Sequence, residues 1–387
     1  MEWKEVRLGD IADVQTGPFG SQLHKSDYIA EGIPCIMPTN IGPHLNLVVD
    51  GIAHVSEVDA NRLSRHLTEF GDIIYARRGD IEKCAYVTPN EEKWLCGTGC
   101  LKIRCKNEVN SRFIAYLLST AECKKWITGN AVGTTMLNLS KGILSNLPLI
   151  IPSLADQRRI ASILSSLDRK IELNNKINAD LEEMAQAIFK NWLSECSDDV
   201  TIGELSLNVT NYEKTDAEKV VLINSSDVTE GYFNHHNYSP NKNLKGHFKK
   251  RFQKGDILYS QVRPRNRHWA YCNFDANDYL ASTQLMIIRN NPSLITSILL
   301  YQYIISDNVW KEFTLKTETR SGTFPQGNYE DLSQIRVPYN SDIEGISYQL
   351  ETLYAKMFML EKENSHLSRL RDTLLPRLMS GEIEVPE

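Results

Sequence analysis

The stretch SLDRKIELNNKIN, residues 166–178, lies close to the middle of a chain of 387 residues. Its apolar side chains are spaced as in a helix, although two adjacent asparagines, Asn174 and Asn175, stand in its centre. The helix that contains it can run from Ser153 to Leu193 without a proline or a glycine. At about 1.5 Å per residue this helix is roughly 60 Å long, which is far more than a small domain needs.

Apolar residues recur along this helix at alternating spacings of three and four, which predicts a heptad seam that packs on another helix. A second helix with the same pattern is expected from about Asp342 onward. A polar residue on each seam, Asn174 and Asn364, either fixes the register of the pair or contacts a partner protein, and both interpretations stay open. The expected seam comprises Ile160, Ile163, Leu167, Asn174, Ile177, Leu181 and Met184 in the first helix and Ile346, Leu350, Leu353, Met357, Leu360 and Asn364 in the second.

The rest of the chain contains an internal repeat. FGDIIYARRGDIEKCAYV (residues 70–87) recurs as KGDILYSQVRPRNRHWAYC (254–272), and WLCGTGCLKIRC (94–105) recurs as YLASTQLMIIRN (279–290). The matched positions keep their order at an offset of 184 to 188 residues, which a chance similarity would not do. Short runs of β-branched residues between glycine and proline turns favour strands in each copy.

The expected fold is therefore α+β, with two similar globules of short-strand mixed sheets and helices, separated by two long helices that form an antiparallel coiled coil. Each globule ends in a proline, Pro152 or Pro338, and Ser153 and Ser341 then begin capping-box patterns. The expected domains are a first globule at 1–152, a central helix at 153–195, a second globule at 196–340 and a C-terminal helix and tail at 341–387.

Composition narrows the class of protein. The chain is 41% hydrophobic and 24% charged, it starts without the apolar run of a signal peptide, and no segment approaches the roughly 20 apolar residues of a membrane span. The eight cysteines include no C-x-x-C pair, so free thiols are expected rather than a zinc site or disulfides. Together these features predict a soluble protein of the cytoplasm, away from membranes.

The charge is unevenly distributed. The net charge of −6 argues against a protein that is basic all over, yet residues 245–267 contain eight Lys or Arg and one acid. Such a local patch can set the field that a polyanion experiences. Within it, QVRPRNRHW (261–269) carries arginines at every second position on a turn stiffened by Pro264, and HFKKRF (247–252) precedes that turn.

DNA contact needs lysine or arginine at phosphates and arginine or polar side chains at base edges. The counterpart of the arginine turn in the first repeat is a pair of arginines, and the small polar loops GTT (133–135) and RSGT (320–323) suit backbone contact. A solvated basic loop is the alternative for each. The candidate DNA-binding residues are Arg77, Arg78, Thr134, Thr135, Lys249, Lys250, Arg251, Arg263, Arg265, Asn266, Arg267, Arg320 and Thr323.

Catalytic motifs are not found in the sequence. There is no glycine-rich cofactor loop followed by an Asn/Asp-Pro-Pro-aromatic motif, and no Walker lysine. The glycine turns GPFGS (17–21) and GTG (97–99) are interpreted as structural, and the loose spacing of Asp80, Glu91 and Lys93 is too common to predict a metal nuclease. No catalytic residue and no metal site is expected in this chain.

Four segments carry a resemblance to a known family. Residues 154–193, LADQRRIASILSSLDRKIELNNKINADLEEMAQAIFKNWL, resemble the central conserved region of the specificity subunit of Type I restriction–modification systems. LRDTLLPRLMSGEIEV (370–385) resembles the distal conserved end of that family, and the GDIIYARRG and GDILYSQVRP turns resemble its target recognition domains.

The resemblance implies a DNA-reading subunit that is not itself an enzyme. Each recognition domain would read one half of a bipartite target, and the paired helices would set the spacer and dock two methyltransferase subunits. S-adenosylmethionine, ATP and magnesium would belong to the partner subunits, which include a motor–nuclease restriction subunit. Because the turns differ between the repeats, the target is expected to be asymmetric.

Two alternatives remain. One is the recognition subunit of a related system in which nuclease and methyltransferase are combined. The other is a coiled-coil scaffold whose globules bind proteins and no DNA.

Overall fold

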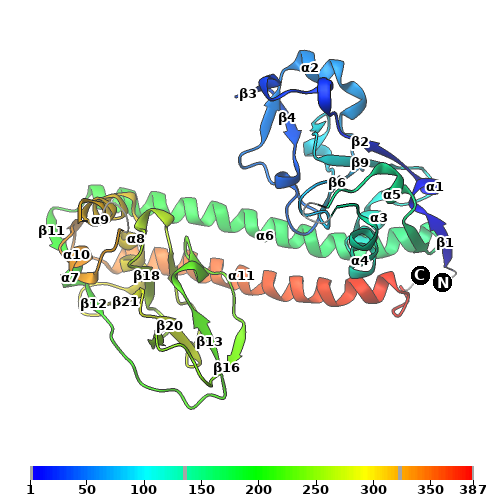
Figure 1. The fold of residues 1–387 in the computed structure, drawn as a ribbon. Helices are drawn as coiled ribbons and strands as arrows, with labels where there is room; N and C mark the ends of the chain where they lie inside the picture. Colours follow the sequence, from blue (N-terminus) through cyan, green and yellow to red (C-terminus); the bar gives the residue numbers. More distant parts are fainter. Residues whose placement is uncertain (1–2, 134–136, 321–324, 386–387) are drawn as a thin grey trace. The chain divides into compact units, whose positions relative to one another are not determined.

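The computed structural model describes residues 3–133, 137–320 and 325–385, and the chain forms two compact units. Unit 1 comprises Met1–Leu173 and Asn364–Glu387, and unit 2 comprises Asn174–Glu363. Each unit therefore contains one globule and a part of both long helices, α6 (Leu154–Ser194) and α11 (Glu344–Met379) (Figure 1).

The globule of unit 1 is built on two four-stranded sheets and a two-stranded ribbon. The first sheet has the order β2 (Ala12–Thr16), β9 (Cys100–Cys105), β6 (Ile73–Ala76), β7 (Cys84–Tyr86), and all of its pairs are antiparallel. The second has the order β3 (Tyr28–Ile29), β5 (Ala53–Val55), β4 (Ile33–Ile36), β8 (Leu95–Cys96), in which β4 and β8 are parallel. The ribbon pairs β1 (Lys4–Arg7) with β10 (Pro148–Ile151), so that the two ends of the globule meet.

Short helices complete this globule. The α-helices are α1 (Leu8–Ile11), α2 (Glu57–Arg62), α3 (Ser111–Leu118), α4 (Ala121–Asn130) and α5 (Lys141–Ser145). The 3₁₀ turns are η1 (Gly20–Gln22), η2 (Lys25–Asp27), η3 (Pro38–Asn40), η4 (Ser64–His66) and η5 (Pro89–Glu91).

The globule of unit 2 repeats the first sheet and the ribbon, whereas its second sheet differs in strand arrangement. One sheet has the order β12 (Ser206–Asn208), β21 (Leu285–Asn290), β18 (Ile257–Ser260), β19 (Trp269–Tyr271). The other has the order β16 (Tyr238–Pro240), β13 (Lys219–Ile223), β20 (Tyr279–Ser282), β17 (Phe248–Lys250), again with one parallel pair, β13 and β20. The ribbon pairs β11 (Asp198–Thr201) with β22 (Arg336–Tyr339). The remaining elements are β14 (Val228–Thr229), β15 (Tyr232–Phe233), α7 (Ile202–Leu205), α8 (Ser297–Ile305), α9 (Asp307–Arg320), α10 (Tyr329–Ser333), η6 (Ser225–Asp227) and η7 (Pro264–Asn266).

The repeated Gly-Asp motif has a structural cause. The buried carboxylate of Asp72 accepts two hydrogen bonds from the guanidinium of Arg104, at 2.8 and 2.7 Å. Asp256 and Arg289 make the same bidentate pair in unit 2, at 2.6 and 2.7 Å. Each pair joins the start of one central strand to its neighbour, which explains why an aspartate and an arginine recur at matching positions.

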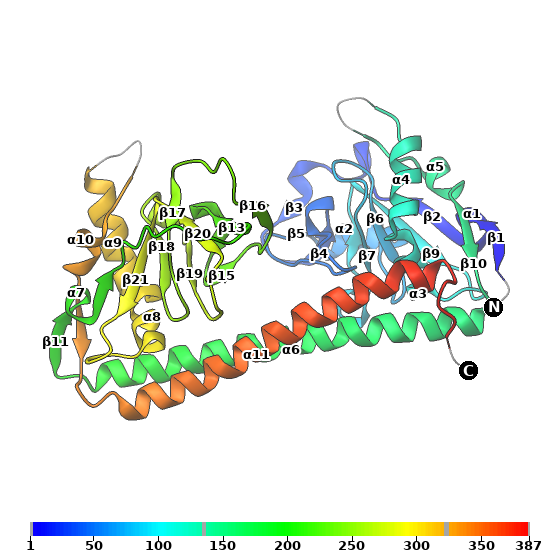
Figure 2. The same ribbon diagram turned by 90° about the horizontal axis from the view of Figure 1, so that it is seen from below.

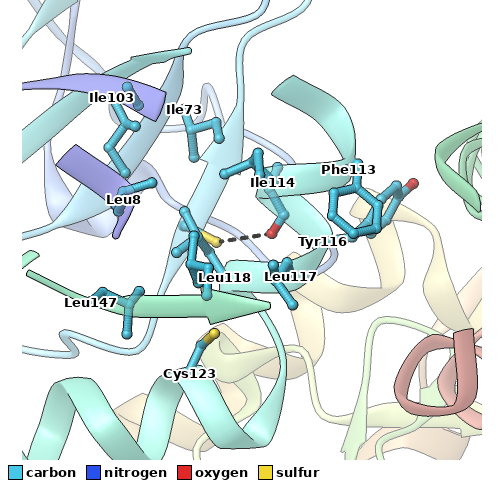
Figure 3. Close-up of a cluster of buried hydrophobic side chains, with 14 of the residues drawn as sticks. Leu8, Ile73, Ile103, Phe113, Ile114, Tyr116, Leu117, Leu118, Cys123 and Leu147 are labelled. Carbon is cyan, nitrogen blue, oxygen red and sulfur yellow. Dashed lines mark hydrogen bonds between the residues drawn. The ribbon is translucent and has the colours of Figure 1, made fainter. Parts of the chain in front are cut away.

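Helix α3 covers the first sheet of unit 1 and provides much of the core (Figure 3). Phe113, Ile114 and Leu118 pack with strand residues such as Ile73 and Ile103. Ile160 and Leu164 of α6 and Leu378 and Met379 of α11 are buried in the same core. Each Å² of apolar area buried between the helices and the globule stabilises the fold by about 25 cal/mol. The two helices therefore belong to the folded unit.

The two long helices pack against each other in each unit and run in opposite directions (Figures 1 and 2). In unit 1, Arg371 of α11 contacts Asp168 of α6, with 3.0 Å between Nη1 and Oδ1. In unit 2, the amide of Asn178 lies 3.4 Å from the carbonyl oxygen of Met357. The predictions of an α+β fold and of two paired long helices are therefore confirmed.

The register of the first seam differs from the prediction in every second position. The buried and half-buried stripe of α6 steps first by four and then by three, through Ile160, Leu164, Leu167, Ile171, Asn174, Asn178, Leu181 and Ala185. The expected Ile163 and Ile177 are half-buried neighbours of this stripe, and the prediction for Met184 is wrong because its side chain is 51% exposed. With 3.6 residues per turn, positions i+3 and i+4 lie on either side of the same line along the helix. The prediction took the larger Met184 for the seam, whereas the smaller Ala185 is the buried residue.

In α11, Ile346, Leu350, Met357 and Leu360 are buried, whereas Leu353 and Asn364 are half-buried.

Asn174 lies fully buried on the stripe, and its amide donates to the Glu363 carboxylate at 2.8 Å. A contact between Asn174 and a partner protein is therefore excluded, whereas a role in the register of the pair agrees with this bond.

The helix starts also differ. Ser153 caps α6 as expected, since its Oγ accepts from the backbone N–H of Asp156 at 3.2 Å. The capping box expected from Ser341 is wrong, because α11 begins only at Glu344. The side chain of Asn340 instead accepts from the N–H of Asp342 at 2.9 Å, which turns the chain before the helix can start.

All eight cysteines are free thiols, and most are buried.

Candidate nucleic-acid interface

The arginine turn of unit 2 follows strand β18 and is held by a neighbouring loop. Arg263 and Arg267 flank the turn η7 with left-handed backbone angles, φ 48° and 51°. The N–H of Arg263 donates to the carbonyl of Pro325 at 3.0 Å, and the N–H of Gly327 donates to the carbonyl of Gln261 at 2.9 Å. The turn therefore lies beside residues 325–327, which follow it about 60 residues later in the chain.

Two of the three arginines of this turn are held by contacts within the unit. Arg265 forms a salt bridge with the carboxylate of Glu318. Arg267 lies 3.2 Å from the carboxylate of Asp307 and stacks over the Trp310 ring at 4.3 Å. Their charges are thus partly compensated, and the expectation of three guanidiniums presented to DNA together is weakened. Asn266 is exposed at the tip of the turn.

The lysine and arginine segment before this turn forms strand β17. Lys249 is exposed, and its ammonium lies 5.0 Å from the centre of the Tyr212 ring. The prediction that Lys250 binds DNA is wrong, because this side chain is 5% exposed and its ammonium donates to the carbonyls of Thr283 and Leu285. Successive side chains of a strand point to opposite faces, so only one of two adjacent lysines can reach the surface.

Arg251 is half-buried and donates to the backbone carbonyl of Asn277. Beside Lys249, a pocket of about 630 Å³ is lined by three further residues that can bind an anion, Lys214, Lys245 and the backbone of Gly246.

Unit 1 has the same arrangement of a basic turn and a polar loop. Arg78 pairs with Asn138 in an antiparallel bridge, and the N–H of Leu139 donates to the carbonyl of Arg77 at 2.9 Å. The matching bridge in unit 2 joins Val262 to Gln326. The structure thus brings the basic turn next to Asn138 and Leu139 in one unit and next to residues 325–327 in the other.

Thr134, Thr135 and Thr323 lie outside the described residues, and of Arg320 only the backbone, at the end of α9, is described.

Among the described residues, no carboxylate forms a salt bridge with Arg77. Its guanidinium is half-buried and lies 5.6 Å from the Phe19 ring, and its Nε has no hydrogen-bond partner. Burial and the neighbouring Arg78 lower the pKa of Arg77 below the ordinary arginine value. Two adjacent cations without a nearby carboxylate create a site at which a phosphate would be stabilised.

Several residues of these surfaces were missed at the level of sequence. Phe19 and Tyr212 are exposed aromatic side chains on the loops that follow β2 and β12. Gln284 is exposed and its carbonyl accepts from the N–H of Gln261, beside the arginine turn. A signal was available for the aromatics, since each stands three or four residues after an equivalent strand.

The described ranges contain no cluster of three or more His, Cys, Asp or Glu side chains suited to a metal ion. Among the same residues, no helix combines the length and the apolarity that crossing a bilayer requires.

Two units with matching first sheets and ribbons, each with a basic turn bonded to a neighbouring segment, define a protein with two related domains. Comparison with known proteins agrees. The family model of the Type I restriction modification DNA specificity domain matches residues 1–183. The specificity subunit of the HindI Type I restriction enzyme from Haemophilus influenzae is 35% identical over 136 residues, which cover 35% of this chain and 30% of that protein.

The specificity subunit of the MjaIX Type I restriction enzyme from Methanocaldococcus jannaschii is 22% identical over 417 residues, covering 100% of this chain and 94% of that protein. The crystal structure of a Type I restriction–modification S subunit from M. genitalium has the same fold, with a TM-score of 0.63 at 17% identity over 97% of this chain and 96% of that chain. Residues 1–183 thus match a Type I restriction modification DNA specificity domain, and the whole chain is similar in sequence to Type I specificity subunits.

Proposed function

We propose that this chain recognises DNA for a Type I restriction–modification complex, and that each unit reads one half of an asymmetric, bipartite target. The observation that supports this most directly is the matching pair of segments in the two units. In both, the turn after the central strand is bonded to a polar loop, through Arg78 and Asn138 in unit 1 and through Val262 and Gln326 in unit 2. The frame is shared while the side chains differ, which suits two domains that read different base sequences.

We assign phosphate contact in unit 1 to Arg77 and Arg78, whose charges lack a carboxylate partner among the described residues. In unit 2 we assign it to Lys249 and the lysines of the neighbouring pocket, together with Arg263. Arg265 and Arg267 can also contact phosphates once their salt bridges with Glu318 and Asp307 break. These salt bridges are weak because the carboxylates are exposed or half-exposed.

The same proposal gives the long helices a partner. Exposed apolar side chains follow each other at intervals of 11 residues, about three helical turns, on both helices. They are Leu173 and Met184 on α6 and Tyr348, Met359 and Leu370 on α11. Leu173 and Met184 are each followed 186 positions later by Met359 and Leu370. A stripe that occurs twice suits two copies of one partner, and we propose that the methyltransferase subunits dock there.

Catalysis and its cofactors then reside in those partners, including a motor–nuclease subunit when DNA is cut. The alternative of a combined nuclease–methyltransferase system would use the same surfaces. The alternative of a scaffold that binds only proteins leaves the uncompensated cations of unit 1 without a function.

The decisive experiment measures binding of duplex DNA by the full chain assembled with methyltransferase subunits, as a function of salt. The logarithm of the affinity should fall linearly with the logarithm of the salt concentration. Arg77→Ala together with Arg78→Ala should weaken binding about 10- to 100-fold and reduce the salt slope by about two. The matched control is Arg62→Ala, which removes an exposed guanidinium of α2 paired with Asp59. A salt-independent complex with protein alone would favour the scaffold.

Docking is tested separately. Leu173→Arg together with Met359→Arg should prevent co-purification of the methyltransferase, because both place a charge in an apolar interface. Val58→Arg, on the exposed face of α2, is the control and should leave assembly unchanged.

A further inference from the structure

An exposed aromatic side chain lies beside a cation in each recognition domain. Phe19 is 55% exposed and lies 5.6 Å from the Arg77 guanidinium, and Tyr212 is 50% exposed and lies 5.0 Å from the Lys249 ammonium. A single exposed apolar residue is common in soluble proteins and needs no explanation. Here, however, the two aromatics lie on equivalent loops of the two units. Each also lies beside a residue to which we assign phosphate contact.

The equivalence of the two loops follows from strand pairing. Phe19 comes three residues after β2, whose Ala12 pairs with Cys105 at the end of β9. Tyr212 comes four residues after β12, whose Ser206 pairs with Asn290 at the end of β21. The two loops therefore follow equivalent edge strands, β2 in unit 1 and β12 in unit 2, of equivalent sheets.

The backbone around Phe19 is held in place by its glycines. The N–H of Gly17 donates to the carbonyl of Cys100 at 3.0 Å, and a Cβ at Gly17 would lie 2.0 Å from the carbonyl oxygen of Gly97. Gly20 has a φ of +62°, which favours glycine. The turn GPFGS therefore packs closely against the turn GTG and leaves the ring of Phe19 at the surface.

The loop of Tyr212 is fixed by different contacts. The N–H of Arg251 donates to the carbonyl of Asn211 at 2.8 Å, and the side chain of Asn211 accepts from the N–H of Glu213 at 2.9 Å. Tyr212 also lines the pocket that holds Lys214 and Lys245. Two unrelated sets of local contacts thus keep an aromatic ring exposed at the same place.

We propose that Phe19 and Tyr212 are DNA-contacting residues, one for each half-site, whose rings pack against base edges in a groove while Arg77 and Lys249 bind the adjacent phosphates. This inference rests on the proposed function and adds two specificity-determining residues to it. An aromatic ring makes apolar contact with a thymine methyl group or opens a base step, and its negative face holds a cation close by. In each recognition domain the ring would thus make one base contact and the cation beside it one phosphate contact.

The test uses the full chain assembled with methyltransferase subunits and a library of 40-base-pair duplexes with a random centre. Selection first yields the target of the wild-type complex, and the affinity for that duplex is then measured for Phe19→Ala and Tyr212→Ala. Each variant should bind about 10-fold more weakly, with the slope against salt unchanged because no charge is removed. Repeating the selection should show relaxed preference in one half-site for Phe19→Ala and in the other for Tyr212→Ala.

Matched controls exist in both units. Phe70→Ala and Tyr238→Ala remove aromatics that are 57% and 55% exposed and that lie on other loops and strands. They should keep wild-type affinity. Phe19→Trp should retain most of the binding, which separates a ring contact from a purely local structural effect.

The outcomes distinguish the two claims. If the wild-type complex binds no DNA, the proposed function fails. If it binds DNA and both alanine variants bind within twofold of it, only the present inference fails. Loss of the methyltransferase subunits with DNA affinity retained would show that the aromatics belong to a protein interface, and relaxed preference in the same half-site for both variants would also overturn the assignment.

Discussion

The buried ion pair between the long helices of unit 1 gives the sharpest stability prediction. Arg371 is 5% exposed, and its guanidinium lies 3.0 Å from Asp168 and 2.8 Å from Asp372. Asp168 also accepts a hydrogen bond from the hydroxyl of Tyr116 on α3. Burial alone would lower the pKa of Arg371, but its bonds to the two aspartates raise it above the ordinary arginine value. The pair therefore stabilises the charge of the guanidinium where the surrounding protein would otherwise disfavour it.

Arg371→Met removes the cation and keeps the apolar stem of the side chain. Two unit charges about 4 Å apart interact with about 4 kcal/mol at an effective dielectric constant of 20. Breaking a buried pair from one side leaves the other charge uncompensated, which costs about 3–5 kcal/mol. Adding Asp168→Asn should restore more than half of this loss, because the amide still accepts from Tyr116 without carrying a charge.

The assay is urea unfolding of the full chain followed by circular dichroism, with the two units allowed separate transitions. Arg377→Met is the matched control on the same helix, since its salt bridge with Glu382 is exposed and should contribute less than about 1 kcal/mol. The reasoning is refuted if Arg371→Met costs less than 1 kcal/mol, or if the double variant is no more stable than the single one.

Three further predictions concern other parts of the chain. Burial and the nearby Glu182 raise the pKa of Glu361 from 4.5 to about 7. Between these two pKa values the folded state holds a proton that the unfolded chain releases, so the stability falls as the pH rises from about 4.5 to about 7. Glu361→Gln should therefore raise the thermal unfolding midpoint at pH 8 and leave it unchanged at pH 5. Lys250→Met should lower stability by about 1–3 kcal/mol, since two carbonyls lose their donor, and a fall in DNA affinity would contradict its placement inside the sheet. Four residues inserted after Leu173 and four after Glu363, where the two units divide, add ~6 Å of helix and should lengthen the DNA spacer by about one or two base pairs. Methylome sequencing measures the spacer, and an unchanged spacer would show that the helices do not set it.

The frame of the fold was predictable because it depends on local patterns. Strand alternation, glycine turns and an uninterrupted helix of 41 residues are each visible in the sequence, and the internal repeat shows that the frame occurs twice. The exact seam was not predictable in the same way. Apolar residues occupy neighbouring positions, such as Met184 and Ala185, and only the packing decides which of the two is buried.

The DNA-binding surface was predictable in position but not in charge. The sequence showed where cations gather, and the structure places basic turns at matching points of both units. It could not show that Arg265 and Arg267 meet Glu318 and Asp307, which lie 53 and 40 residues away. Nor could it show that Arg77 forms no salt bridge with any described carboxylate, because compensation of charge depends on distant residues that the fold brings together.

The two units show how far a shared frame can tolerate different chemistry. In unit 1 the hydroxyl of Tyr116 donates to Asp168, and in unit 2 the amide of Gln302 donates to the hydroxyl of Tyr354, with each partner 186 positions later. Arg371 has its counterpart in the buried Ala185, so the cation is present only where the acceptor is charged.

An isolated exchange of Arg371, Tyr354 or Ala185 for its counterpart would bury an aspartate or an arginine without its partner. The frame of each unit is therefore maintained by a locally consistent set of residues rather than by identical ones. Exposed side chains at the candidate DNA surface, such as Arg78 and Asn266, are free of this constraint, because they end in solvent. Differences between the repeats should consequently come in coordinated sets inside the units and independently at the surface, which is what a protein with one fold and two separate half-site specificities requires.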